Sequence, residues 1–172
     1  MLPMRDMIRT DRLILRLMRL EDFEALRDIW CRDEVKSTYM LPDLEDAAAA
    51  ADLFRRYMGL APGRLCYVVC LRDRPVGFIH EVRSEGDTVE VGYAFHPDCW
   101  GRGCASEALR AVIAELFRMG AQAVTAGYFE NTPASGRVME KCGMGPVDRV
   151  ESVPYRGEVR RCLYRQIRRP HR

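Results

Sequence analysis

The stretch DCWGRGCASEALRAVI, residues 98–113, has two glycines around an arginine and leads directly into a strongly periodic helix. Apolar residues recur at three-and-four spacing from Ala105 to Phe117, and Gly120 stands where a helix C-cap belongs. Glycines let the backbone turn tightly and expose its N–H groups, and the helix start adds the positive end of its dipole. The stretch therefore indicates a site for an anion, often a phosphate, at the start of this helix.

A glycine-containing loop before a helix also occurs in proteins that bind dinucleotides or nucleoside triphosphates. In the dinucleotide pattern a third glycine stands where this chain has Ser106, and no acidic residue ends a strand about twenty residues further on. The Gly-Lys-Ser/Thr ending of the Walker loop is also absent. When the loop is considered alone, an ordinary connection into a core helix is an equal alternative.

The 172 residues predict one domain, residues 1–172, because no repeat and no linker rich in Pro, Gly or Ser divides them. The order is one strand, two helices, three strands, a helix, a strand, a helix and two strands. This order is typical of a mixed α/β sandwich whose front half is antiparallel. The predicted strands are 11–18, 65–72, 75–83, 88–96, 123–130, 145–153 and 158–167, and the predicted helices are 21–30, 42–58 (opening near Asp43), 105–117 and 133–143.

The composition is that of a globular chain, with 48% hydrophobic residues, 30% charged residues and a net charge of +2. This balance argues against a nucleic-acid partner, and we interpret the basic stretch 160–172 as an edge strand with a solvated tail. Three histidines and seven cysteines show no zinc-ligand spacing, so no metal is expected. There is no signal peptide and no apolar run of bilayer length, which predicts reduced thiols, a cytoplasmic location and no membrane partner.

Two segments taken together resemble a known family. They are VGYAFHPDCWGRGCASEAL, residues 91–109, and, after one strand, FENTPASGRVMEKCGM, residues 129–144. Both are similar to the GNAT superfamily of acyl-CoA-dependent N-acetyltransferases. RTDRLILRLMRLEDFEAL and PVGFIHEVRS fit its ribosomal-protein alanine N-acetyltransferase branch, so the resemblance covers nearly the whole chain. It implies an α/β GNAT fold: a mixed sheet of six to seven strands, splayed between the fourth (88–96) and fifth (123–130) strands, with about four helices.

The resemblance also implies acetyl-CoA as the cosubstrate. In this family the CoA pyrophosphate lies on backbone N–H groups of the loop before the main helix, and the pantetheine arm pairs with the fourth strand like an added strand. Asn131 and Ser135 match positions that contact the pantetheine and thioester, although they stand four positions apart where this branch usually has three. The loop maps to Gly101, Arg102, Gly103, Cys104, Ala105 and Ser106, and the strand backbone maps to Val91, Tyr93 and Phe95.

Acetyl transfer to an amine requires a neutral amine, stabilisation of an oxyanion and a proton for the thiolate. Glu90 is the first candidate for the base and Glu81 the second, while an ion pair between Glu90 and an arginine is an equal alternative. The last helix lacks the tyrosine that many members use as an acid, so Ser135 is the candidate partner of the thiolate. A backbone N–H near Tyr93 is the candidate oxyanion donor. His80 and His96 are bases by residue type only, since neither occupies a position that the family uses.

The predicted function is direct acetyl transfer to a primary amine in a ternary complex, by a monomer or homodimer. The acceptor is a peptide N-terminus ending in alanine or serine, or a small cationic amine. Two other classes stay open: a catalytically silent acyl-CoA-binding sensor and an NAD(P)-dependent oxidoreductase. An acidic rim that would attract a cationic acceptor is predicted from Asp33, Glu34, Asp43, Glu45 and Asp46, set against Arg32 and Lys36.

Overall fold

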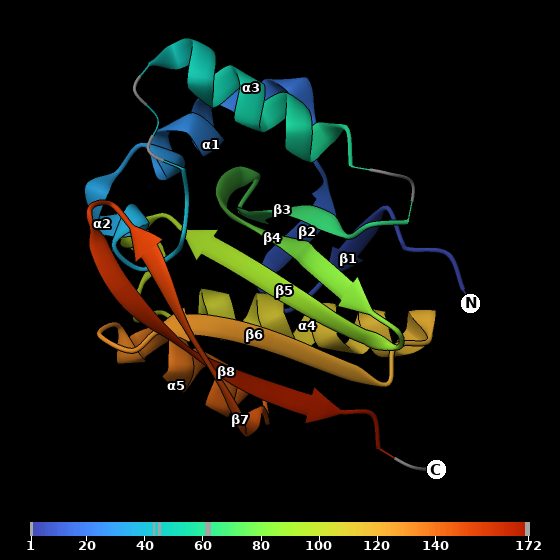
Figure 1. Cartoon of the computed structure of the whole chain (residues 1–172). Coiled ribbons are helices and arrows are strands. Elements are labelled where there is room, and N and C mark those ends of the chain that lie inside the picture. Colours follow the sequence, from blue (N-terminus) through green and yellow to red (C-terminus); the bar gives the residue numbers. More distant parts are fainter. Residues whose placement is uncertain (1, 43, 45, 61–62, 171–172) are drawn as a thin grey trace.

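The computed structural model describes residues 2–42, 44, 46–60 and 63–170. One eight-stranded sheet runs through the molecule in the order β1-β2-β3-β4-β5-β6-β8-β7 (Figure 1). Neighbouring strands are antiparallel except β5 and β6, which are parallel. The strands are β1 (Met7–Arg9), β2 (Leu13–Leu17), β3 (Cys66–Leu71), β4 (Arg74–Glu85), β5 (Thr88–Phe95), β6 (Ala123–Phe129), β7 (Gly145–Tyr155) and β8 (Glu158–Arg168).

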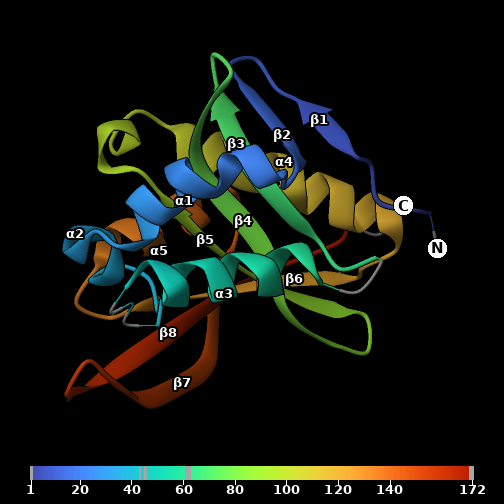
Figure 2. The same cartoon turned by 90° about the horizontal axis from the view of Figure 1, so that it is seen from above.

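Helices cover both faces of the sheet. Figure 2 shows α1 and α3 over one face and α4 over the other. The core on the α4 side contains Leu109, Val112 and Leu116, which confirms the periodicity of the opening stretch. The core on the other side is formed around Trp30, Phe54 and Phe78. The helices are α1 (Phe23–Trp30), α2 (Asp33–Lys36), α3 (Ala47–Met58), α4 (Cys104–Met119) and α5 (Pro133–Lys141).

Two-residue turns connect β3 to β4 and β7 to β8. Arg72 and Asp73 have φ values of 49° and 63°, and Arg156 and Gly157 have 52° and 77°. Positive φ at both central positions is the type I′ arrangement, whose twist matches that of the flanking strands. These turns therefore fix the registers of the two hairpins.

Three sequence-based expectations need correction. The sheet has an additional short strand, β1, and a single-turn helix, α2, both too short to show a hydrophobic period. The helix predicted to open near Asp43 begins at Ala47, because the Asp46 side chain accepts a hydrogen bond from Ala49 N–H (2.8 Å); Asp43 lies outside the described residues.

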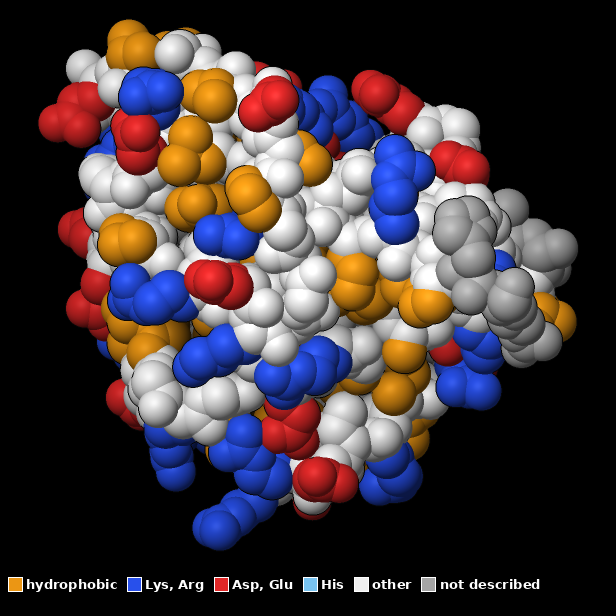
Figure 3. Space-filling view, turned by 90° about the horizontal axis from the view of Figure 1, so that it is seen from below, with side chains coloured by type: hydrophobic (Ala, Val, Ile, Leu, Met, Phe, Trp, Pro, Cys, Tyr) orange, Lys and Arg blue, Asp and Glu red, His pale blue; other side chains and the backbone are white. Residues whose placement is uncertain are grey.

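The basic C-terminal stretch is not an edge strand. β8 lies between β6 and β7, so β7 forms the edge. Its arginines are also paired locally: Arg161 contacts Glu130 (3.0 Å) and Arg160 contacts Glu158 (3.6 Å). Figure 3, which looks at the molecule from below, shows lysine and arginine side chains on this face with fewer acidic side chains scattered among them. The surface therefore carries mixed charge there, without a uniformly basic patch.

The sheet opens between β5 and β6, as predicted. The two strands pair from Thr88↔Ala123 to Val91↔Ala126, and the pairing stops there although both strands continue. A register shift in β4 between Glu81 and Arg83 lies opposite the point where they part. A bulge increases local twist and bends a strand, which accounts for the separation of β5 from β6. The gap begins at Gly92.

Within the described ranges, no helix is long and apolar enough to cross a bilayer. The described side chains also include no group of three or more His, Cys, Asp and Glu residues placed to hold a metal ion. All seven cysteines are free thiols.

Candidate active site

The loop at the start of α4 presents a row of backbone N–H groups. Gly101 and Gly103 adopt left-handed φ values of 69° and 79°, which few residues other than glycine tolerate. Gly103 is the N-cap of α4 and supplies no capping side chain. Among the described residues, no acceptor receives the N–H groups of residues 101–106, and the first internal bond of α4 runs from Glu107 N–H to Gly103 O (3.0 Å). Six consecutive donors at the positive end of a 16-residue helix form a ready anion site.

Arg12, the residue before β2, holds this loop in place. Its guanidinium donates to Arg102 O (2.8 Å) and forms an ion pair with Glu107 (2.7 Å). Glu107 also accepts from Thr10 Oγ1 (2.7 Å) and Arg12 N–H (2.9 Å). Burial alone would raise the pKa of Glu107, but these hydrogen bonds hold it below its usual value. Sequence reasoning missed Arg12, because nothing in the chain indicates that residues 95 positions apart meet here.

A cavity of about 250 Å³ adjoins the loop on the α4–α5 side of β5. It brings together most of the residues predicted to contact the cofactor. Arg102 lies outside it, lining a separate cavity with Arg12, Arg72 and Arg74, and donates to Asp98 O (3.4 Å). The exposed Asn131 does not line it. The predicted residues that do line it are Tyr93, Phe95, Gly101, Gly103, Cys104, Ala105, Ser106 and Ser135.

The backbone of β5 faces the gap at alternate residues. His96 N–H donates to Val76 O across the β4–β5 pair (2.7 Å), and in an antiparallel ladder every second residue points the same way. Tyr93 and Phe95 therefore direct their N–H and C=O groups toward β6, where the ladder has ended. Trp100 Nε1 donates a hydrogen bond to Phe95 O (2.9 Å), so this carbonyl already has a partner. Val91 is the last rung of the β5–β6 ladder, so its backbone is less available than predicted.

Ser135 and Tyr93 meet at the wall of this cavity. The Tyr93 hydroxyl donates to Ser135 O (3.3 Å) from a ring packed in the α4-side core. Burial raises the pKa of Tyr93 far above its usual value, so the phenol stays protonated. Ser135 lies half-buried in the first turn of α5, and its hydroxyl makes no hydrogen bond to any residue that the structure describes. Cys142 is buried and its thiol contacts Ser106 O (3.3 Å), which places it in the core.

A second cavity of about 180 Å³ lies around the same gap. Glu90 and Gly92 of β5 form one wall, and aromatic rings from β6 and β8 form the other. Thr38 lines both cavities, so the two adjoin at the opening of the sheet. The lining residues include Tyr39, Met40, Gly127, Tyr128, Phe129 and Tyr164.

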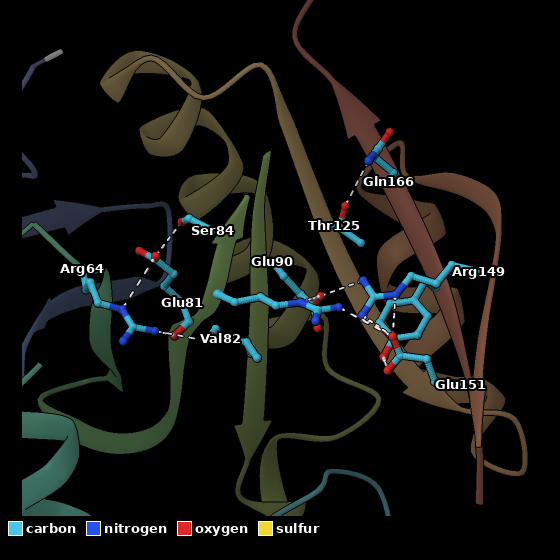
Figure 4. A network of polar contacts seen from close by, with 11 residues as sticks. Arg64, Glu81, Val82, Ser84, Glu90, Thr125, Arg149, Glu151 and Gln166 are labelled. Carbon is cyan, nitrogen blue, oxygen red and sulfur yellow. Dashed lines mark hydrogen bonds and ion pairs between the residues drawn. The ribbon is translucent and has the colours of Figure 1, made fainter. Parts of the chain in front are cut away.

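Glu90 is held by two arginines. Its Oε2 accepts from Arg83 Nε (2.9 Å). It also accepts from an Arg149 guanidinium nitrogen (2.8 Å), and Figure 4 shows Arg149 directed toward Glu90. Arg149 stacks on the Tyr164 ring, 3.7 Å from its centroid. Burial raises the pKa of Glu90, and the hydrogen bond from Arg83 opposes that shift. Glu90 is therefore paired with arginines, which is the alternative that the sequence left open. Its other oxygen, Oε1, has no hydrogen-bond partner among the described residues.

Glu81, the second candidate base, makes contacts away from the cavity beside Glu90. Its carboxylate accepts from Ser84 Oγ (2.6 Å) and lies 3.7 Å from Arg64, away from Glu90 (Figure 4). His96 is likewise occupied elsewhere: its Nδ1 accepts from Asp98 N–H (3.1 Å). Neither residue lines the cavity beside Glu90.

The described carboxylates of the predicted acidic rim already have partners within the protein. Asp33 pairs with Arg156 (2.8 Å), Glu34 lies 3.6 Å from Arg32, and Asp46 caps α3. Asp43 and Glu45 lie outside the described residues. Free carboxylates are therefore fewer here than the sequence alone indicates.

Comparison with known proteins identifies the family. Residues 12–145 match the model of the acetyltransferase (GNAT) domain. The uncharacterized N-acetyltransferase YoaA of Bacillus subtilis (strain 168) is 29% identical over 144 residues, covering 79% of this chain and 81% of that protein. The chain therefore belongs to the GNAT acetyltransferase family.

Solved structures agree with this assignment. A GNAT-family acetyltransferase from Bacillus anthracis superimposes with a TM-score of 0.83 and 26% identity, covering 94% of this chain and 98% of the other. The ribosomal-protein α-N-acetyltransferase RimL in complex with coenzyme A superimposes with a TM-score of 0.82. At 14% identity, with 94% and 97% of the two chains covered, this second likeness shows the fold alone.

Proposed function

We propose that the protein transfers an acetyl group from acetyl-CoA directly to a primary amine within a ternary complex. The observation that carries the proposal is the row of backbone N–H groups at residues 101–106. These groups lie at the same gap between β5 and β6 as the backbone N–H and C=O of Tyr93, which have no partner in β6. The donors suit the pyrophosphate, and the strand edge suits the amide groups of the pantetheine arm. The thioester is thereby delivered to the opening of the sheet, next to the second cavity. The proposed compartment is the cytoplasm, where seven free thiols stay reduced.

The residues around the opening divide the chemistry. Glu90 removes a proton from the incoming ammonium, directly or through water, using the oxygen that no arginine occupies. The Tyr93 N–H stabilises the oxyanion as the amine attacks the carbonyl carbon. The C–S bond then breaks, and the Ser135 hydroxyl donates a hydrogen bond to the departing thiolate. Holding both substrates in one complex supplies a large share of the rate by proximity.

The acceptor proposed first is a peptide N-terminus, in keeping with the branch that the sequence resembles and with RimL, which is a ribosomal-protein α-N-acetyltransferase. A small cationic amine is the second candidate. The second cavity, which we propose as the acceptor cavity, is lined mainly by apolar and aromatic residues with the single carboxylate of Glu90, so it suits an amine attached to a compact apolar group.

The test is release of free CoA thiol from acetyl-CoA in the presence of a panel of amines and N-terminal peptides. We expect turnover with at least one class, together with a rise in melting temperature on adding acetyl-CoA alone. A melting-temperature shift without turnover on any acceptor would support the silent sensor. A shift with NAD or NADP in place of acetyl-CoA would support the oxidoreductase.

A further inference from the structure

A buried tyrosine–histidine pair lies against β5 where the sheet opens. Tyr39 follows α2, and its hydroxyl oxygen is 2.6 Å from His80 Nε2 on β4. His80 is the register partner of Gly92. A Cβ at Gly92 would lie 2.5 Å from the Tyr39 hydroxyl oxygen, so only glycine leaves room for this approach. The pair therefore lies beside Gly92, the first residue of β5 that has no partner in β6.

The neighbours of His80 determine which ring nitrogen carries the proton. Nδ1 lies 3.1 Å from Glu81 O, a carbonyl that only accepts. A neutral imidazole must then carry its hydrogen on Nδ1, which leaves Nε2 as an acceptor. The Tyr39 hydroxyl consequently donates to Nε2, and the lone pairs of its oxygen remain to accept a hydrogen bond from a ligand in the acceptor cavity.

The surroundings keep both groups in these states. Burial lowers the pKa of His80 to about 4, with the Arg64 charge acting in the same direction, so the ring is neutral near pH 7. Burial likewise raises the pKa of Tyr39 well above its usual value. The titratable and charged groups around the pair are Tyr57 from α3, Cys66 from β3, Arg64, Glu90 from β5 and Tyr155 from β7.

The segment that carries Tyr39 is anchored from the far end of the sheet. The Tyr155 hydroxyl lies within hydrogen-bond distance of three carbonyl oxygens, those of Lys36 (2.9 Å), Tyr39 (3.1 Å) and Leu41 (2.9 Å). It also accepts from Leu41 N–H (3.2 Å). These contacts fix the backbone on both sides of Tyr39, so the phenol is held in position before an acceptor arrives.

We propose that Tyr39 is a catalytic residue that receives the proton of the acceptor amine during attack and passes its own proton to His80. This inference rests on the proposed acetyltransferase function. As the N–C bond forms, a proton leaves the amine nitrogen for the Tyr39 oxygen while the phenolic proton moves to Nε2. The C–S bond breaks, and as the imidazolium returns one proton to the Tyr39 oxygen, Tyr39 releases one proton through solvent to the thiolate, giving amide, free thiol and the neutral pair. His80 acts through Tyr39 and is a positioning and proton-holding residue.

The weak basicity of His80 suits this timing. A base of such low pKa does not deprotonate an alkyl ammonium, which is the task proposed for Glu90. The nitrogen becomes far more acidic once it is bonded to the acetyl carbon, and at that stage a buried neutral imidazole is sufficient. Glu90 and the Tyr39–His80 pair would therefore act on successive protons of the same nitrogen.

The test compares Tyr39→Phe, His80→Gln and the double variant with wild type, using the best acceptor from the amine panel. Glutamine keeps an acceptor near the Nε2 position but cannot hold a proton. Tyr57→Phe is the matched control. The centroids of the Tyr57 and His80 rings are 4.8 Å apart, but the Tyr57 hydroxyl does not hydrogen-bond to the described His80 imidazole. We expect kcat to fall about 100-fold in Tyr39→Phe and His80→Gln, with an unchanged Kd for acetyl-CoA. The double variant should lose no more than either single one, and Tyr57→Phe should keep wild-type kcat.

The outcomes separate this inference from the function on which it rests. Wild-type kcat should show a solvent deuterium isotope effect that Tyr39→Phe diminishes, which a purely structural role of the ring would not produce. Additive losses, or a Tyr39→Phe enzyme with wild-type kcat, would overturn the relay while leaving the acetyltransferase intact. A wild-type enzyme that releases no CoA with any amine would overturn the proposed function and the relay together.

Discussion

The two sides of the opening between β5 and β6 differ in the chemical groups that would recognise a ligand. On the cofactor side the recognising groups are backbone N–H donors from one continuous loop and one strand edge. On the acceptor side they are side chains drawn from β4, β5, β6, β8 and the segment after α2. A backbone site needs only local geometry, whereas a side-chain site depends on the packing of distant segments. The cofactor side therefore tolerates sequence changes around its glycines. Substitutions on the acceptor side can alter the choice of acceptor without disturbing cofactor binding.

Gly103→Val should have the largest effect and act only on the cofactor side. Valine is strained at φ 79°, and its Cβ would lie 3.2 Å from the Arg12 guanidinium, so the loop must move. We expect acetyl-CoA to bind at least about 100-fold more weakly by calorimetry. Gly145→Val is the matched control, because nothing lies within 4 Å of a Cβ at that position. Unchanged binding by a folded Gly103→Val protein would show that the loop does not hold the cofactor.

Gly92→Ala should break the acceptor side alone. The added methyl group meets the Tyr39 ring and hydroxyl at 2.5–3.0 Å and must displace them. We expect kcat/KM for the acceptor to fall about 30-fold while the Kd of acetyl-CoA stays the same. Equal losses in both constants would mean that the two sides are not separable.

Glu90→Gln should lower turnover about tenfold near neutral pH and less at high pH, where free amine is abundant. The wild-type rate should fall as the pH drops through the carboxyl pKa, which burial raises above its usual value. The variant should lack this acidic limb in a plot of kcat/KM against pH. A loss that is the same at every pH would assign Glu90 to holding Arg83 and Arg149.

Ser135→Ala distinguishes a chemical role from a binding role on the cofactor side. We expect kcat to fall about fivefold, because the thiolate loses a hydrogen-bond donor, with little change in acetyl-CoA affinity. Weaker binding with unchanged kcat would make Ser135 a cofactor contact only.

Glu107→Gln should have the smallest effect, on stability alone. The folded-state pKa of Glu107 lies below the ordinary 4.5, so its charged form stabilises the fold above that pH, and this contribution disappears as the pH falls through the folded-state value. Melting curves should place the variant a few degrees below wild type at pH 7, with the two converging in acid. A constant difference at all pH values would exclude the ionised Glu107–Arg12 contact as the cause.

The same contrast explains what the sequence could predict. The α4 loop and the main helix depend on neighbouring residues, so the glycines at 101 and 103 and the period from Ala105 to Phe117 indicated them correctly. The splayed strands followed from the family resemblance and are present at Val91. Val91 lies in the β5–β6 ladder, and Arg102 and Asn131 do not line the cavity beside the loop, because their placement depends on strand register and on the exit from β6.

The acceptor side was less accessible to sequence reasoning. Tyr39 and His80 are 41 positions apart, and only the packing of the segment after α2 onto β4 joins them. The arginines on Glu90 come from β4 and β7, and Arg149 reaches Glu90 although β6 and β8 lie between β7 and β5 in the sheet. Gly92 was a possible signal, since glycine inside a strand often marks a close approach.

Amide NMR during titration with acetyl-CoA tests the central claim most directly, because it reports on individual N–H groups. The cofactor should shift the amide signals of Gly101 to Ser106 and of Tyr93, where donors now lack partners. Signals from Tyr39 and the β7–β8 hairpin should respond only when an amine is added. Shifts that leave residues 101–106 unchanged, or that first appear around Tyr39, would contradict the assignment of the two sides.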